Sequence, residues 1–154
     1  MLQGRVPDPR VAISAAITRP SETTVLDGHI RFIVFQRDTP PDAFDAVEVR
    51  VVARVRQAMN FDATGKPVMS SNDDNWVVRN IAIPCRASPV KDEPQMFEIK
   101  PRDPDMEFSP GRYALVIKGR GFDFSVAGNV TDKKQCLTRL VAANGTFYSE
   151  CQKP

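Results

Sequence analysis

The chain has 154 residues, of which 42% are hydrophobic, and its 21 basic and 19 acidic side chains leave a formal net charge of +2. A domain of this length buries roughly 68–70% of its unfolded surface, so one core suffices. The balanced charge excludes the basic footprint of a nucleic-acid binder, and no apolar run approaches the ~18 residues of a membrane-spanning helix. We expect a single domain over residues 1–154, with 1–10 as a flexible lead and 129–154 as a C-terminal tail.

Short apolar segments alternate with prolines along the chain. The 13 prolines leave little room for a long helix. In chain order, strands are expected over Val11–Thr18, Ile30–Gln36, Val47–Val55, Trp76–Ile83, Gln95–Ile99, Arg112–Lys118 and Phe122–Val126. Many short strands with turn signals between them indicate a sandwich or a barrel. The predicted fold is therefore all-β, a single immunoglobulin-like β-sandwich of about seven strands, with a small closed barrel as the alternative.

Two of these strands carry specific expectations about burial. Ile30–Gln36 is apolar on both faces in its middle, which is typical of a central strand. Val47–Val55 alternates, with valines and an alanine on the core face. The opposite face, expected to be wet, carries Glu48, Arg50, Val52, Arg54 and Arg56.

A β-hairpin is the most specific local signal in the chain. Gly119 and Gly121 allow the positive φ that tight hairpin turns require. Upstream, Pro110-Gly111 suits the central positions of a type II turn. The residues expected to be buried on the two strands of the hairpin are Tyr113, Leu115, Ile117, Phe122, Phe124 and Val126.

The segment Pro110–Leu115 (Pro-Gly-Arg-Tyr-Ala-Leu) is similar to the "PGxYxL" strand entry of bacterial envelope sandwich modules of immunoglobulin-like or transthyretin-like type. Residues 49–55, 61–67, 110–116 and 142–151 resemble uncharacterised envelope proteins of rhizobia-type α-proteobacteria. The resemblance implies a bacterial origin and carries no activity.

Two of the three cysteines lie near the ends of the C-terminal tail. Cys136 and Cys151 enclose a loop of about 15 residues, and a disulfide there contributes roughly 3 kcal/mol in the chain-entropy model. Asn144-Gly145 is an apt reversal to bring the two sulfur atoms together, and a short helix is expected over Lys133–Ala143. We predict the Cys136–Cys151 disulfide over two unpaired thiols. Cys85 is expected to be a buried, inert thiol.

Residues for catalysis or metal binding are sparse. His29 is the one histidine, and beside Gly28 it is expected to be a partly exposed turn residue rather than a catalytic base. Asp73 and Asp74 in an Asn-Asp-Asp-Asn run have two interpretations, calcium ligands or a solvated turn, of which the turn is favoured. We predict no enzyme activity, no cofactor and no metal site.

One stripe of basic residues is a candidate binding face. Arg50, Arg54 and Arg56 share the wet face of one strand, joined by Arg79 and by Trp76 as an apolar platform if the next strand pairs beside it. Such a face binds anionic groups through paired guanidinium contacts. Glu48 on the same face offers the alternative of cross-strand ion pairs, and a solvated sheet face is favoured.

The favoured function is a non-catalytic interaction or structural module of an exported bacterial envelope protein, with a protein partner. The alternative is a domain that binds a small ligand, an anionic glycan or a lipid headgroup on the Arg50/Arg54/Arg56 face. The disulfide implies a periplasmic or extracellular location. Residues 1–10 lack the apolar centre of a signal peptide, so we expect the signal or anchor to lie outside this chain.

Overall fold

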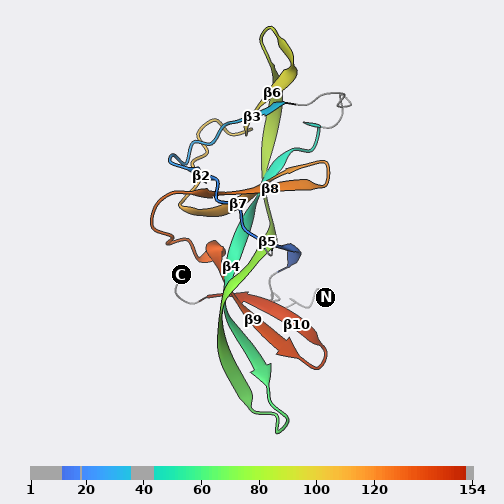
Figure 1. Cartoon of the computed structure of the whole chain (residues 1–154), viewed down its shortest axis with the longest axis vertical. Coiled ribbons are helices and arrows are strands. Elements are labelled where there is room, and N and C mark those ends of the chain that lie inside the picture. The colour runs from blue at the N-terminus through green and yellow to red at the C-terminus, as the bar shows by residue number, and fades with distance from the viewer. Residues whose placement is uncertain (1–11, 18, 36–43, 152–154) are drawn as a thin grey trace, which may run out of the picture.

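The computed structural model describes residues 12–17, 19–35 and 44–151, and the side chains of residues 57–58 and 69–74 lie outside this description. The expected flexible lead over residues 1–10 also lies outside it. The described chain is built almost entirely of strands, which confirms the all-β prediction (Figure 1). In this part of the chain, no helix has the length and apolarity needed to cross a bilayer.

Ten strands form one mixed sheet. They are β1 (Ile13–Ile17), β2 (Thr24–Val25), β3 (Phe32–Phe35), β4 (Glu48–Phe61), β5 (Pro67–Val90), β6 (Glu93–Pro101), β7 (Gly111–Ile117), β8 (Arg120–Val126), β9 (Cys136–Ala142) and β10 (Gly145–Glu150). The main path runs β2-β8-β7-β4-β5-β6-β3, while β1 pairs with β5, and β9 pairs with both β10 and β4. Immunoglobulin-like topology stays a prediction, because this order does not establish it.

The sheet folds over a shared core. β5 is 24 residues long, and its first part pairs with β4 while its last part pairs with β6. The two ends of the path therefore meet face to face, and Phe32 of β3 contacts Phe124 of β8 at a centroid distance of 4.9 Å. The core between them is formed by Ile30, Val47, Val49, Val51, Cys85, Ile99, Phe108, Tyr113, Leu115, Ile117, Phe124 and Val126.

The C-terminal tail adds a hairpin to the sheet. β9 runs parallel to β4, and β10 returns antiparallel to β9, so this hairpin lies beside the β4–β5 hairpin (Figure 1). Leu137 is fully buried in a second core with Ala53, Val55 and Val77. The helix expected over Lys133–Ala143 is wrong: only the 3-10 turn η2 (Lys133–Gln135) is helical. The free edge of β4 and the disulfide outweigh local helix propensity.

Three burial expectations are also corrected. β3 is an edge strand rather than a central one, with Ile33 and Phe35 about half exposed, because it pairs with β6 at the end of the path. Phe122 is 54% exposed, near the turn of the β7–β8 hairpin. Val52, expected on a wet face, has no exposed area. The remaining core residues expected on β4, β7 and β8 are buried.

The two turns predicted around β7 differ in outcome. Lys118 and Gly119 have φ of +44° and +78°, which confirms the tight β7–β8 hairpin turn. Gly111 has φ of +154° and begins β7 opposite Val126, which is not the left-handed position of a type II turn. A Cβ at this position would overlap the Gln135 side chain, so a larger residue there requires Gln135 to move.

Candidate ligand-binding groove around Trp76

Trp76 of β5 lies beside two arginine side chains. Arg54 of β4 is its cross-strand partner, and the Arg54 guanidinium carbon is 6.0 Å from the centroid of the indole ring. Arg112 of β7 approaches the same ring to 4.9 Å. A guanidinium within about 6 Å of an aromatic face is attracted by the ring quadrupole, so these side chains hold one another in place.

Arg112 is fixed by its surroundings. Its Nη1 donates to Asp123 Oδ2 at 2.7 Å and to the Ser21 carbonyl at 3.0 Å. The Gln135 side chain accepts from the Arg112 backbone N–H at 2.8 Å and donates to its carbonyl at 3.1 Å. The Arg112 side chain is 14% exposed. A ligand that meets this cation therefore does not bear the entropy cost of ordering it.

A groove of about 550 Å³ opens beside these residues, and we call it the Trp76 groove. Its lining combines arginines, an aromatic ring and a small apolar wall, and includes Arg54, Arg56, Trp76, Arg112, Gly128 and Val130. Guanidinium groups present paired N–H donors that fit the oxygens of carboxylate, sulfate or phosphate. The ring and Val130 offer apolar contact to the rest of a ligand.

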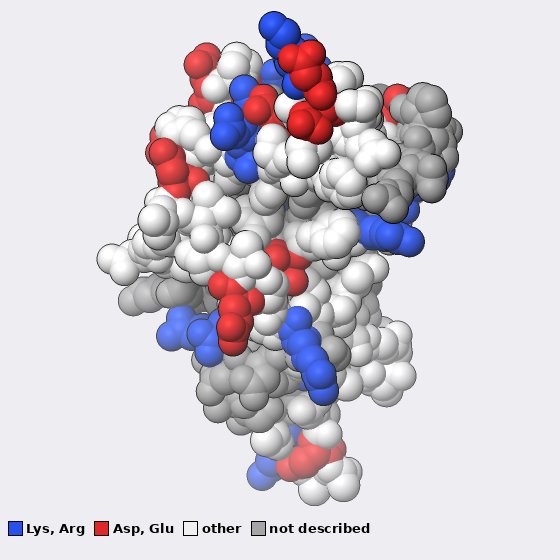
Figure 2. Space-filling view, turned by 45° about the horizontal axis from the view of Figure 1, so that its top comes forward, with Lys and Arg blue, Asp and Glu red and all other residues white. Residues whose placement is uncertain are grey.

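The charges of the whole chain are close to balanced. On the face drawn in Figure 2, acidic and basic side chains are interspersed, and neither sign forms a continuous field. The net charge of +2 for the whole chain agrees with this picture. Recognition of an anion therefore depends on direct contact with the arginines and not on long-range steering.

Arg50 is separated from the rest of the predicted arginine face. Its Nε donates to Glu48 Oε1 at 2.7 Å, an ion pair within β4 and not the cross-strand pair that was expected. Both residues line a second groove of about 800 Å³, which we call the Arg50 groove. Val52, which lies between Arg50 and Arg54 on β4, is fully buried and divides the stripe. The structure therefore brings Arg54, but not Arg50, to Trp76.

Arg79 does not join the arginine face. Arg54 and Trp76 are directly opposite each other and share a face, so residues at odd spacing from Trp76 on the same strand point the other way. The Arg79 side chain is 7% exposed, and its Nη1 donates to Glu150 Oε1 at 2.8 Å and to the Lys134 carbonyl at 3.0 Å. Arg79 is a buried structural cation.

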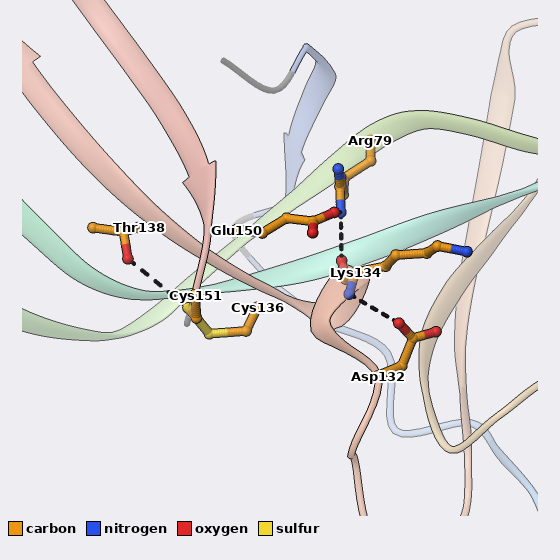
Figure 3. The surroundings of a disulfide bond; sticks show 7 residues. All are labelled: Arg79, Asp132, Lys134, Cys136, Thr138, Glu150 and Cys151. Carbon is orange, nitrogen blue, oxygen red and sulfur yellow. Dashed lines mark hydrogen bonds and ion pairs between the residues drawn. A yellow bond between two sulfur atoms is a disulfide. The ribbon is translucent and has the colours of Figure 1, made fainter. Parts of the chain in front are cut away.

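The predicted Cys136–Cys151 disulfide is present beside this cation (Figure 3). The two Cα atoms are 5.5 Å apart, and the Cys151 N–H donates to the Cys136 carbonyl at 3.1 Å. The bridge joins the start of β9 to the end of β10, and Glu150 directly precedes Cys151. The disulfide therefore fixes the carboxylate that pairs with Arg79.

Cys85 is buried and His29 is exposed, as the sequence predicted for each. Cys85 is 1% exposed, and burial raises the pKa of its thiol to about 11, so it is not a thiolate at neutral pH. His29 is exposed, with Nδ1 2.9 Å from Asp27 Oδ1, as expected of a turn histidine. The turn expected at Asp73 and Asp74 is wrong, because both residues lie within strand β5. Their side chains lie outside the described part, so nothing tests the calcium alternative.

Sequence reasoning missed the contribution of Arg112. Its strand was predicted, and the alternation that buries Tyr113 places Arg112 on the opposite face. The missing information was the pairing of β7 with β4. It sets Arg112 opposite Val52, two residues before Arg54 on β4. Comparisons with protein-family models, with curated proteins and with solved structures gave no match.

Proposed function

We propose that this chain is a non-catalytic interaction module of an exported bacterial envelope protein. The disulfide supports an oxidising location, since such bonds are rare in a reducing cytosol. The proposal assigns no chemistry to Cys85, because a nucleophilic cysteine needs an accessible thiolate and this thiol is buried. A protein partner in the envelope remains the favoured kind of ligand.

A second candidate function is specific to the Trp76 groove. We propose that the groove binds an anionic glycan or lipid headgroup through Arg54, Arg56 and Arg112, with Trp76 beside the ligand. The observation that carries this proposal is the convergence of these side chains from β4, β5 and β7 on one groove. Arg112 adds a fixed cation to the arginines expected from the sequence.

Trp76 provides the assay, because it is the one tryptophan in the chain. Its fluorescence should change when a sulfated glycan, an acidic peptide or anionic lipid vesicles are titrated at low salt. Arg54→Ala/Arg56→Ala should weaken binding together with its salt sensitivity, since exposed charges are screened over roughly 8 Å at physiological ionic strength. Arg86→Ala/Arg120→Ala removes equal charge at exposed positions away from this groove and is the matched control.

The three probes separate the two candidate functions. Binding of the glycan or the vesicles, lost in Arg54→Ala/Arg56→Ala and kept in the control, supports the small-ligand function. Binding of the acidic peptide alone with the same pattern supports the protein-interaction module and places its contact at this groove. If the wild-type protein responds to none of the probes at low salt, the groove takes part in neither proposed function.

A further inference from the structure

A histidine and two carboxylates from distant parts of the sequence converge at one point of the surface. The ligand atoms of Asp27, His29 and Glu107 all lie within 4.8 Å of one another. His29 Nδ1 is 2.9 Å from Asp27 Oδ1. None of the three is among the residues that line the Trp76 groove or the Arg50 groove, so this cluster is a separate place on the molecule.

The two backbone segments that carry the cluster are hydrogen-bonded to each other. Gly28, between Asp27 and His29, accepts a hydrogen bond from the backbone N–H of Phe108 at 2.8 Å. Phe108 directly follows Glu107, and its side chain, 2% exposed, anchors this segment in the core. A Cβ at Gly28 would overlap the Phe108 carbonyl, so only glycine lets the two segments approach this closely. The two segments that carry the ligands are therefore fixed relative to each other.

Contacts with His29 orient the Asp27 side chain. The backbone N–H of His29 donates to Asp27 Oδ1 at 3.0 Å, and the imidazole contacts the same oxygen atom. These contacts, the backbone one first, lower the pKa of Asp27 below its usual value.

The donor set determines which ion fits. One imidazole nitrogen and two carboxylates match the N/O ligands of Zn²⁺ and related transition metals, whereas Ca²⁺ and Mg²⁺ favour oxygen ligands. Tetrahedral Zn²⁺ at about 2.1 Å from each ligand sets neighbouring ligand atoms about 3.4 Å apart. The ligand atoms of these three exposed residues lie within 4.8 Å of one another, so the side chains must turn toward a shared ion to reach this spacing.

We propose that Asp27, His29 and Glu107 form a divalent transition-metal site, with Zn²⁺ as its best-matched ion. Three protein ligands leave a fourth position for water or for a ligand from a partner. Such an ion joins the segment after β2 to the segment before β7. The site is independent of the Trp76 groove and does not rest on the proposed function.

The test is a Zn²⁺ titration of protein freed of any affinity tag, at neutral pH. Calorimetry gives the affinity, and the imidazole NMR signals report the place of binding, because the chain has one histidine. Asp27→Asn and Glu107→Gln should each weaken Zn²⁺ binding at least about tenfold, the effect that loss of an outer-shell partner already has. His29→Ala should abolish it.

Asp105→Asn is the matched control, since Asp105 is an exposed acid in the same segment and is not part of the cluster. It should bind Zn²⁺ like the wild-type protein. If wild type, Asp27→Asn and Glu107→Gln bind Zn²⁺ with equal affinity, the two carboxylates are not ligands, and the proposal is overturned. No shift of the imidazole signals at millimolar Zn²⁺ would overturn it as well. Circular dichroism of each variant checks that the fold is retained.

Discussion

Replacing Glu150 by alanine leaves the buried Arg79 guanidinium without its carboxylate partner. The Arg79 side chain is 7% exposed and the Glu150 side chain 40%, so the pair is buried at its cationic end and partly solvated at the other. Removing one partner of a fully buried ion pair costs about 3–5 kcal/mol. Because water replaces part of the carboxylate here, we expect Glu150→Ala to cost about 1–3 kcal/mol, the range for a buried polar group left unsatisfied.

Thermal and urea unfolding measure this loss. At about 2–4 °C per kcal/mol for a domain of this size, the midpoint should fall by about 2–12 °C. Glu93→Ala, at an exposed position on β6, is the control and should change stability by less than about 0.5 kcal/mol. Arg79→Met removes the cation that needs a partner, so Glu150→Ala should cost much less in that background. Equal costs of Glu150→Ala in both backgrounds would refute the coupling.

Three further substitutions test other parts of the structure. Gly111→Ala should cost about 1–3 kcal/mol because the new Cβ overlaps Gln135, and it should cost less in a Gln135→Ala background; equal costs would assign the effect to φ alone. The raised pKa of Cys85, from 9.0 to about 11, means that the unfolded thiol ionises first as pH rises. The free energy of unfolding should therefore fall between these pH values more steeply in wild type than in Cys85→Ala, and parallel pH profiles would contradict the burial of the thiol. Cys136→Ser/Cys151→Ser should lose about 3 kcal/mol in urea unfolding, and an unchanged midpoint would show that the bridge does not constrain the tail.

Local sequence patterns predicted the features that depend mainly on residues close together in the sequence. The alternation in β4 correctly placed Val49 and Val55 in the core, and glycine identified the β7–β8 turn. Spacing and compartment arguments predicted the disulfide, because Asn144-Gly145 allows a reversal between Cys136 and Cys151.

The errors come from long-range pairing, which alternation does not encode. Val52 is buried because Val78 and Ala114 of neighbouring strands pack against it, so the wet face of β4 is interrupted. Arg79 points away from Arg54 because of the register between β4 and β5. The same kind of information brings Glu107 to His29, across a sequence separation that a single pattern cannot bridge.

The most direct test of the proposal that this chain is an exported module is the state of its cysteines in living cells. Cells that produce the protein from its natural gene are treated with an alkylating reagent at lysis, and the peptides are identified by mass spectrometry with and without reductant. We predict that Cys136 and Cys151 resist alkylation until they are reduced, and that Cys85 reacts after denaturation alone. Alkylation of Cys136 and Cys151 without reductant would place the chain in a reducing compartment and contradict the account.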